Sequence, residues 1–298
     1  MHTRRPRYRR VAVSAAAVAG ALALSACGAG ATTAPSQNAL DRIKKNGELV
    51  IATDATYAPN EFQQKGRIVG FDIDLGTEIA RRLGVTVKFK NVKFDDILPA
   101  LRSKTYDLGL SSITDNEQRE RSLDFVTYFS AGTSLMVKAG NPEKLSPGDL
   151  SLCGKKIAVQ KGTTQADELT PKSSADSGAG SRVEKCRRGG RPAPVKLPMH
   201  DQGAADLALS EGRADAVLAD SPVAGYVVKQ SGGKLALAGK AYDTAPYGIA
   251  VPKDEDDLLD AIQKTVKNMI SDGFYKMYAD IWGVADGGII DPQVNGAG

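Results

Sequence analysis

The stretch from Asp107 to Phe125 carries the side chains whose types and spacing could do chemistry. Ser111, Ser112 and Thr114 follow a short apolar run, and Arg119 lies just beyond them. A planar guanidinium donates two parallel, charge-assisted hydrogen bonds to a carboxylate, and hydroxyls with loop amides can complete such a site. No nucleophile in the stretch has an obvious base. The stretch therefore predicts a carboxylate-binding site, with an ordinary strand, a polar turn and a solvated arginine as the alternative.

Alternating strands and helices are expected to position these side chains. The apolar and turn-forming residues predict a helix that ends at Asn46 and Gly47, a strand over 48–52, a helix over 75–83, a strand over 85–89 and a helix that opens at 94–96. This order predicts an α/β fold with βαβ units. Asp54 and Tyr57 follow the first strand, and ligands of open α/β sheets bind where strands end.

Residues 1–37 are expected to precede the folded part. Five arginines come before an apolar stretch over 11–26 that is too short for a comfortable membrane span, which predicts an export signal over 1–26. The end of this signal, Leu24-Ser25-Ala26-Cys27, resembles the lipobox of bacterial lipoproteins, in which the cysteine sulfur receives the lipid; the alternative is an incidental buried thiol. Residues 27–37 resemble a flexible tether. The export route stays open, because no full twin-arginine motif is present.

The balance of charges argues against nucleic acid as a partner. Removal of residues 1–26 leaves 34 of the 39 lysines and arginines against 35 acids, so the remaining chain is close to neutral. It has no basic patch interleaved with aromatic residues. His200 is the only histidine after residue 26, and the sequence has no HExxH, GxSxG or P-loop motif and no clustered Cys/His spacing. We therefore expect no metal, no cofactor and no catalytic residue.

Seven sequence blocks, in their order along the chain, resemble the bacterial extracytoplasmic solute-binding proteins of family 3. The blocks are TDATYAP (53–59), IVGFDIDL (68–75), LPALRSKTYDLGLSSIT (98–114), LDFVTYF (123–129), GKKIAVQKGTT (154–164), GRADAVLADSP (212–222) and PYGIAV (246–251). Each block alone is weakly specific, but their common order is strongly specific and covers nearly the whole chain after the tether. The family serves polar amino acid ABC transporters as substrate-binding lipoproteins.

The resemblance implies a two-lobed periplasmic-binding-protein-like fold of type II, with the ligand in the cleft between the lobes and a hinge of two segments. Lobe 1 is expected at 38–136 and 245–298, and lobe 2 at 137–244. Apolar residues at helical spacing from Leu258 to Ile270 predict a helix in the core of lobe 1. We expect a monomer that closes on its ligand.

The resemblance also implies a set of ligand contacts. In lobe 1, Arg119 matches the arginine that pairs with the α-carboxylate of the ligand, and Asp54 matches a position that meets a polar or cationic side chain. Other lobe 1 matches are Tyr57 and Phe94, which would sandwich the side chain but are also typical of a core, and Ser111, Ser112 and Thr114, which would share the carboxylate. Lobe 2 matches are Gln160 for the side chain, Thr163 and Thr164 for the carboxylate, and Asp220 for the α-ammonium. Asn60 departs from the family, which usually has an aromatic wall there.

Two cysteines of the predicted lobe 2, Cys153 and Cys186, are expected to form a disulfide, because an even pair outside the cytoplasm is usually bridged. The bridge would tie a strand to an insertion over 171–194. This insertion is rich in serine, glycine and basic residues, which predicts an irregular surface excursion.

These expectations predict an extracytoplasmic protein, anchored by lipid to the outer face of the cell membrane, that captures a free polar or basic amino acid and delivers it to an ABC transporter permease. A second ligand carboxylate would meet Asp54 without a compensating cation, so arginine, lysine, histidine and glutamine are favoured over glutamate and aspartate. Two alternatives stay open: a secreted dehydratase acting on cyclohexadienyl acids or arogenate, as in a few relatives, and a ligand-sensing receptor component.

Overall fold

The computed structural model describes residues 38–171 and 181–297. The predicted signal over 1–26, the tether over 27–37 and the lipidation site Cys27 lie outside these residues. Within the described ranges, no helix is long and apolar enough to cross a membrane.

Strands and helices alternate along the first part of the chain, as predicted. Helix α1 (Ala39–Asn46) begins where the Asn38 side chain accepts a hydrogen bond from the Asp41 amide, and it ends at Gly47 in the left-handed region. Strand β1 (Glu48–Thr53) follows and pairs in parallel with β5 (Thr86–Asn91) and β6 (Leu108–Gly109). The helices between these strands are α2 (Phe71–Leu83) and α3 (Phe94–Arg102). A small antiparallel sheet of β2 (Thr56–Tyr57), β3 (Glu61–Gln64) and β4 (Arg67–Val69) precedes α2.

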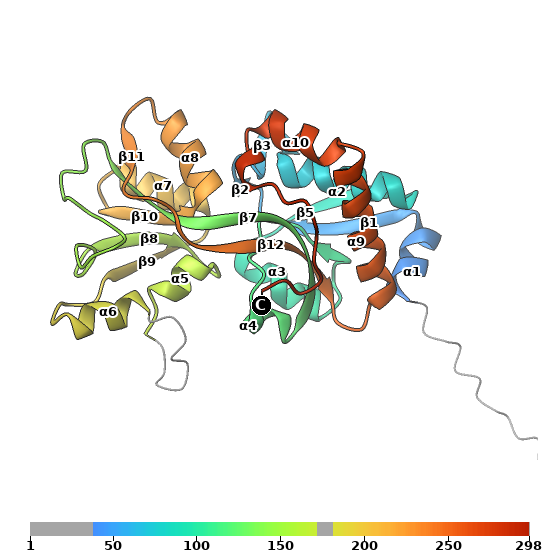
Figure 1. Ribbon diagram of the computed structural model, residues 1–298, viewed down its shortest axis with the longest axis horizontal. Coiled ribbons are helices and arrows are strands. Elements are labelled where there is room, and N and C mark those ends of the chain that lie inside the picture. Colours follow the sequence, from blue (N-terminus) through green and yellow to red (C-terminus); the bar gives the residue numbers. More distant parts are fainter. Residues whose placement is uncertain (1–37, 172–180, 298) are drawn as a thin grey trace, which may run out of the picture. The chain divides into compact units, whose positions relative to one another are not determined.

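Two long antiparallel strands carry the chain between two lobes (Figure 1). Strand β7 (Leu123–Lys138) pairs with β12 (Tyr242–Pro252) along its first part and with β10 (Ala216–Asp220) and β11 (Leu235–Leu237) at its end. The strands of both lobes therefore form one sheet, in the order β5-β1-β6-β12-β7-β10-β8-β9 with β11 beside β7. The pairing shifts register between Tyr242 and Ala245 of β12. These two strands are the two segments of the hinge.

The sheet of lobe 1 is covered by helices on both faces. Ile51 of β1 packs in one core with α2, α9 (Asp256–Ser271) and α10 (Phe274–Trp282), whereas its neighbour Ala52 packs in another with α3. Successive strand residues point to opposite faces, so a strand buried on both faces is apolar throughout. The predicted core face of α9 is confirmed, because Leu258, Ile262 and Val266 are buried.

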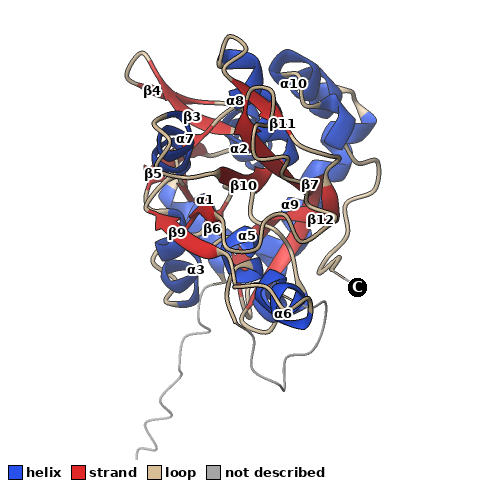
Figure 2. Cartoon of the chain, turned by 90° about the vertical axis from the view of Figure 1, so that its left-hand side faces the viewer, coloured by secondary structure: helices blue, strands red, loops and turns tan. Residues whose placement is uncertain are grey.

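Lobe 2 repeats this three-layer arrangement (Figure 2). In its sheet, β8 (Lys156–Gln160) lies between β10 and β9 (Val195–Met199). Helices α7 (Gln202–Ser210) and α8 (Ser221–Gln230) pack with Ala158 on one face, and α5 (Thr164–Glu168) packs with Ile157 on the other. Separate cores support the proposed lobes at 38–136 with 245–298 and at 137–244. Leu135 and Met136 already pack in lobe 2 cores, so we propose that the first crossing lies a few residues earlier.

The predicted disulfide between Cys153 and Cys186 is present and joins residues 33 positions apart. Cys186 belongs to helix α6 (Arg182–Arg188), so the prediction of an irregular excursion over 171–194 is wrong for this part. The Ser181 side chain accepts a hydrogen bond from the Glu184 amide and so begins the helix. The buried Arg182 forms an ion pair with Glu168 of α5, which holds α6 against the lobe.

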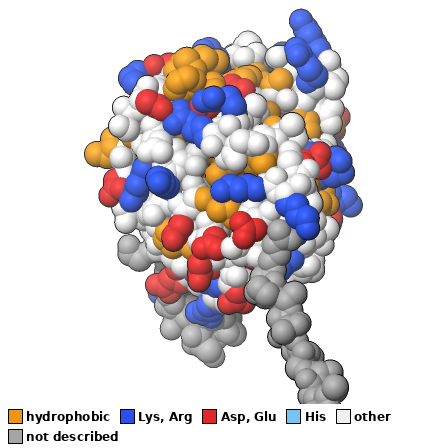
Figure 3. All heavy atoms as spheres, turned by 90° about the vertical axis from the view of Figure 1, so that its right-hand side faces the viewer, with side chains coloured by type: hydrophobic (Ala, Val, Ile, Leu, Met, Phe, Trp, Pro, Cys, Tyr) orange, Lys and Arg blue, Asp and Glu red, His pale blue; other side chains and the backbone are white. Residues whose placement is uncertain are grey.

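Basic and acidic side chains are interspersed on the face that carries α1 and α9 (Figure 3). Near α1 and the start of α9, Arg42 forms an ion pair with the buried Asp107, and Lys104 forms one with Glu255. A mixed surface of this kind gives that face no strong field of a single sign, in agreement with the near-neutral charge of the chain after residue 26.

Candidate ligand-binding site

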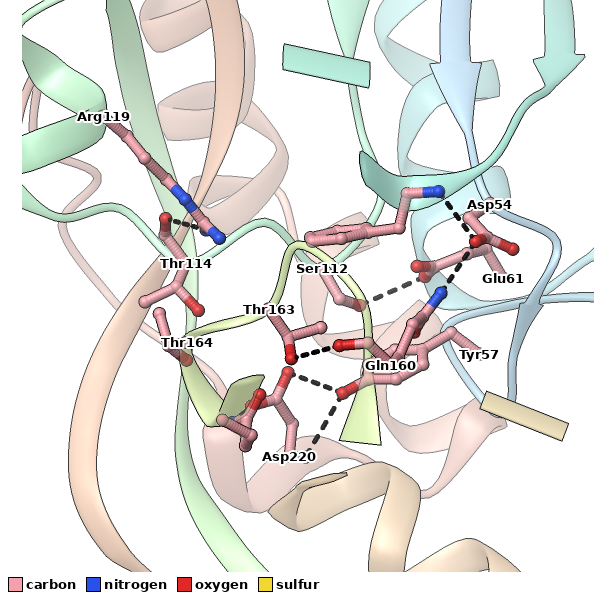
Figure 4. Close-up of a pocket in the computed structure, with 12 residues that line it drawn as sticks. Asp54, Tyr57, Glu61, Ser112, Thr114, Arg119, Gln160, Thr163, Thr164 and Asp220 are labelled. Atoms are coloured by element: carbon pink, nitrogen blue, oxygen red, sulfur yellow. Dashed lines mark hydrogen bonds between the residues drawn. The ribbon is translucent and has the colours of Figure 1, made fainter. Parts of the chain in front are cut away.

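A small cavity lies between the lobes and is lined from both of them (Figure 4). Its lining residues are Asp54, Tyr57, Glu61, Phe94, Ser112, Thr114 and Arg119 from lobe 1, and Gln160, Thr163, Thr164, Gln165 and Asp220 from lobe 2. Every predicted ligand contact except Ser111 thus lies on this cavity.

Arg119 lies at one end of the cavity, on the short helix α4 (Glu117–Glu120). Its guanidinium donates hydrogen bonds to the Thr114 carbonyl (2.7 Å) and to the Gly162 carbonyl of lobe 2 (2.9 Å). The guanidinium carbon is 5.9 Å from the centre of the Phe94 ring. Burial lowers the pKa of Arg119, but nearby carboxylates oppose this shift and arginine stays charged in proteins. The group is a fixed cation suited to a ligand carboxylate.

The loop from β8 to α5 brings lobe 2 to the same end of the cavity. The Thr163 hydroxyl accepts a hydrogen bond from the Ala166 amide (3.2 Å), which begins α5, and donates to the Gln160 carbonyl (2.8 Å). Gly162 has a φ of 79°, and a Cβ at this position would lie 3.0 Å from Asp95 of α3. Glycine permits both the backbone conformation and this close approach of the lobes.

Asp220 ends β10 and lines the cavity from lobe 2. Its carboxylate accepts hydrogen bonds from the Tyr57 hydroxyl (2.9 Å) and from Nε2 of Gln165 (2.8 Å). The Asp220 amide in turn donates to the Tyr57 hydroxyl oxygen (3.2 Å). Burial raises the pKa of Asp220, whereas its hydrogen bonds and the charge of Arg119 favour the ionised form. A carboxylate held in this way is suited to an ammonium group.

Asp54 follows β1 and lies at the end of the cavity away from Arg119 (Figure 4). Its carboxylate accepts hydrogen bonds from the Phe94 amide (3.0 Å), the Thr56 hydroxyl (2.7 Å) and Nε2 of Gln160 (2.8 Å). Gln160 belongs to lobe 2, so this contact also joins the lobes. Burial raises the pKa of Asp54, and these hydrogen bonds oppose the shift.

The two serines after β6 have different positions. Ser112 lines the cavity, and its hydroxyl donates a hydrogen bond to Glu61 (3.1 Å). Ser111 does not line the cavity, because its hydroxyl accepts a hydrogen bond from the Asp54 amide (2.9 Å) and donates to Glu61 (3.0 Å). Ser111 therefore positions Asp54 and Glu61 without lining the cavity itself. The sequence predicted a direct ligand contact instead.

Asn60, at the position where the family usually has an aromatic residue, is buried beside Ser112. Its Nδ2 donates a hydrogen bond to the Ser112 hydroxyl (2.8 Å). Its Oδ1 has no hydrogen-bond partner among the described residues. Asn60 is not a lining residue of the cavity, so its effect on the site acts through Ser112.

The sequence analysis missed two lining residues, Glu61 and Gln165. Glu61 begins the short strand β3, where a charged residue indicates an exposed edge, yet its side chain is fully buried. No local pattern marks it. Gln165 directly follows the two predicted threonines, so the helix start at Thr163 was a usable signal for it.

The two ends of the cavity have opposite electrostatic character (Figure 4). Arg119, Thr114 and Thr164 lie at one end, and Asp54 and Glu61 lie at the other. Within the described chain, Arg119 is the only basic residue that lines the cavity, and the lining includes three carboxyl groups. Such a site matches a ligand with a carboxylate at one end and a positive or amide group at the other.

Comparisons with known proteins agree with this geometry. Residues 49–285 match the family described as bacterial extracellular solute-binding proteins, family 3. The arginine-binding protein ArgT of Corynebacterium glutamicum is 29% identical over 257 residues, which are 86% of this chain and 80% of that protein. The L-cystine-binding protein TcyJ of Escherichia coli is 30% identical over 249 residues, 83% of this chain and 86% of that protein. A mutant of the arginine-binding protein ArgBP from T. maritima has a solved structure with a TM-score of 0.72 and 33% identity, covering 82% of this chain and 98% of that one.

The similarity to a solved binding protein confirms the predicted architecture. The described residues have the two-lobed periplasmic-binding-protein fold of type II, in which the cleft between the lobes takes the ligand. The cavity described above lies in that cleft and includes polar groups from both lobes.

Proposed function

Because this chain belongs to the bacterial extracellular solute-binding proteins of family 3, we propose that it binds a basic amino acid, with arginine favoured over lysine, histidine and glutamine, and delivers it to an ABC transporter permease. Its curated relatives are binding proteins and not enzymes, and the same holds for this chain. Amino acid binding for ABC transport fits the family. The identity of the amino acid is the part that we propose from the cavity.

The α-amino acid part of the ligand has matched partners in the cavity. A carboxylate placed beside Arg119 can accept hydrogen bonds from the guanidinium and from the hydroxyls of Thr114 and Thr164. An ammonium group on the same carbon can donate to Asp220 from the other lobe. This arrangement supports recognition of the zwitterion by both lobes together.

One observation carries the choice of side chain: two carboxyl groups, Asp54 and Glu61, lie at the end of the cavity away from Arg119 (Figure 4). A guanidinium or ammonium at the end of the ligand side chain would donate charge-assisted hydrogen bonds to them. Gln160 adds an amide at the same end. The relatives ArgT and ArgBP are named for arginine, which supports the same choice.

Ligands with a second carboxylate are disfavoured by the same groups. Glutamate or aspartate would bring a negative charge towards Asp54 and Glu61, and no lining residue at that end supplies a cation. Cystine, for which the relative TcyJ is named, carries a second ammonium beside its second carboxylate, and that carboxylate would also lack a cation at this end, so cystine should bind less tightly than arginine.

The proposal is tested by competition for bound, radiolabelled arginine on the purified protein. Unlabelled arginine, lysine, histidine and glutamine should displace the label, whereas glutamate, aspartate and cystine at equal concentration should not. Displacement by glutamate or cystine at lower concentration than arginine would show that Asp54 and Glu61 do not select the side chain.

Closure of the lobes is proposed to complete the site. Asp220, Gln160 and Thr164 come from lobe 2, whereas Arg119 and Asp54 come from lobe 1, so a separated pair of lobes offers half of the contacts. Small-angle scattering should therefore show a smaller radius of gyration, and the mass of a monomer, when arginine is added. An unchanged radius at saturating arginine would contradict closure.

We propose that Cys27 anchors the protein to the membrane by lipid, from the likeness of Leu24-Ser25-Ala26-Cys27 to a lipobox. A tether of small polar residues would let the folded part work at the outer face of the membrane. The variant Cys27→Ala, expressed with its signal, should lack lipid by mass spectrometry and leave the membrane fraction or stay uncleaved. Lipid on that variant would show another attachment site.

A further inference from the structure

Glu61 and Asp72 form a buried carboxyl pair at the wall of the cavity. Both residues are 0% exposed. Glu61 lines the cavity, and Asp72, in the first turn of α2, lies outside the lining. Ser112 contacts both groups, because its hydroxyl donates to Glu61 (3.1 Å) and its amide donates to Asp72 (2.8 Å). Oδ2 of Asp72 also accepts a hydrogen bond from the Tyr128 hydroxyl (2.7 Å), whereas its buried Oδ1 has no hydrogen-bond donor among the described residues.

No positive side chain balances this pair. Among residues 38–171 and 181–297, none of the ion pairs includes Glu61 or Asp72. Two buried carboxyl groups that share the neighbour Ser112 and have no positive partner cannot both be ionised without a large cost, so the pair holds one proton. A proton on Glu61 can be donated to Oδ1 of Asp72, which has no other donor among the described residues, and burial raises the pKa of Glu61 well above its usual range, so we assign the proton to Glu61.

The other titratable groups around Glu61 also favour the protonated pair. Tyr57 of β2 and Tyr128 of β7 are neutral, and a negative charge on Glu61 raises the pKa of both hydroxyls. The remaining charged groups of the cavity are the carboxyl groups of Asp54 and Asp220 and, at the far end, the guanidinium of Arg119. A cation that enters the near end therefore meets one ionised group, Asp54, and one neutral group, Glu61 (Figure 4).

We propose that Glu61 binds the cationic end of the ligand side chain, and that the proton shared with Asp72 passes to the solvent when that cation arrives. The inference rests on the proposed binding of a basic amino acid at Asp54 and Glu61, and adds the release of a proton when the cation binds. The O–H bond of Glu61 breaks, its proton goes to the buffer, and the carboxylate accepts hydrogen bonds from the guanidinium or ammonium. No other bond changes.

A released proton links affinity to pH and to the charge of the ligand. Because binding of arginine releases a proton, its association constant should rise with pH, by up to about tenfold per pH unit while the pair is fully protonated. The side chain of glutamine carries no cation. Its amide can accept or donate a hydrogen bond at a neutral Glu61. The affinity for glutamine should therefore show no such pH dependence. The preference for arginine over glutamine should increase with pH.

The proton count is measured directly by isothermal titration calorimetry of the purified protein near pH 7. Arginine and glutamine are each titrated in two buffers that differ in ionisation enthalpy, and the difference in binding enthalpy gives the protons exchanged. We expect release of nearly one proton for each arginine and of none for each glutamine. Arginine binding with no proton release overturns the inference.

The variant Glu61→Gln tests whether Glu61 is the source of the proton and the partner of the cation. Ser111 and Ser112 donate to different oxygens of Glu61, so the amide can keep one of these hydrogen bonds while its nitrogen donates to Asp72. The fold should be retained, with cooperative thermal unfolding as the check. Loss of a charged hydrogen-bond partner should weaken arginine binding by about tenfold or more, and by more than it weakens glutamine binding. Proton release should disappear. Proton release that persists in this variant would place the source elsewhere, at Asp54 first, and overturn the inference.

The variant Asp72→Asn is the matched control, because it changes the other member of the pair and leaves Glu61 on the cavity. Its side-chain oxygen can still accept from the Ser112 amide and from Tyr128. Without an acidic neighbour Glu61 should ionise more readily, so arginine affinity should be kept while proton release falls. If a folded Asp72→Asn protein loses as much arginine affinity as Glu61→Gln, the loss comes from disruption of the carboxyl pair as a structural unit. That result would overturn the role of Glu61.

The same titrations separate this inference from the proposed function. Arginine binding without proton release contradicts the inference alone. Absence of arginine binding in the unmodified protein, together with binding of glutamate or cystine, contradicts the proposed function.

Discussion

The hydroxyl of Tyr57, on β2 of lobe 1, donates a 2.9 Å hydrogen bond to the carboxylate of Asp220, at the end of β10 in lobe 2. Gln160 and Asp54 form a corresponding bond of 2.8 Å between the lobes at another part of the cavity. Each of these pairs joins a group of one lobe to a proposed ligand contact of the other. Ligand binding and association of the lobes should therefore be coupled in free energy.

Asp220→Asn should weaken ligand binding strongly. The variant removes the negative partner of the α-ammonium in a buried site, and truncating one member of such a charge pair costs roughly 2–5 kcal/mol of binding free energy. The exposed Asp243 of lobe 2 offers the same change away from the cavity, as Asp243→Asn. Calorimetric dissociation constants for arginine should rise for the first variant and stay near the unmodified value for the second. Equal constants for both variants would show that Asp220 does not hold the ammonium.

Tyr226→Ala should weaken ligand binding although Tyr226 does not line the cavity. The ring of Tyr226, on α8 of lobe 2, is 6.1 Å from the ring of Phe62 in lobe 1, and Phe62 in turn is 5.7 Å from Trp282. An aromatic pair contributes about 0.5–1.5 kcal/mol beyond its buried area, so its loss should lower the closed population and the affinity by about two- to tenfold. Dissociation should become faster, as measured by stopped-flow fluorescence.

A matched control for Tyr226 is found within lobe 1. The rings of Phe274 and Tyr278 are 6.3 Å apart on the single helix α10, so Phe274→Ala removes an aromatic contact that does not join the lobes. This variant should change the free energy of unfolding but not the dissociation rate of the ligand. The interpretation of Tyr226 as a contact that favours closure fails if both variants release arginine equally fast.

Removal of the disulfide should lower stability without changing affinity. The bridge closes a loop of 33 residues between Cys153 and Cys186, for which the chain-entropy model gives roughly 3–4 kcal/mol of free energy of unfolding. Neither cysteine lines the cavity. The double variant Cys153→Ser with Cys186→Ser should unfold at lower urea concentration and bind arginine with the parent constant. A parent-like urea midpoint would show that the bridge adds no stability.

Local sequence patterns were enough for most of the elements. The helix that ends at Gly47 and the strand that follows were predictable because a helix cap and an apolar run are local signals. Helix α6 was not, because its serine, glycine and basic surroundings resemble a loop, and its stability depends on the disulfide at Cys186 and on the ion pair between Arg182 and Glu168. Such tertiary contacts leave no periodic pattern in a short segment.

The residues of the site were predictable from the family resemblance, but the hydrogen bonds among them were not. Arg119, Asp54 and Asp220, which the motifs predicted as ligand contacts, line the cavity. Ser111 was misplaced and Glu61 was missed for the same reason, because the two residues contact each other across 50 positions of sequence. Which hydroxyl points to a ligand and which supports a carboxyl group depends on contacts of this range.

Stability should fall as pH rises from mildly acidic to neutral values. Burial raises the pKa of Asp206 to about 7, whereas an unfolded aspartate titrates near 4. The folded protein therefore binds more protons than the unfolded chain between these values, and this group lowers the free energy of unfolding with pH by up to about 1.4 kcal/mol per unit. Urea unfolding near pH 5, 6 and 7 should show a shallower decrease for Asp206→Asn than for the unmodified protein. The same slope in both would contradict the shifted titration.

The dissociation constant for arginine in three proteins tests the central claim, that the cavity around Arg119 binds a basic amino acid. The unmodified protein and the variant Arg121→Ala, whose changed residue is exposed next to α4, should bind arginine equally well. Arg119→Ala should lose nearly all binding, because a buried ligand carboxylate without its cation costs roughly 2–5 kcal/mol. A folded Arg119→Ala protein that binds arginine with the parent constant would contradict the account.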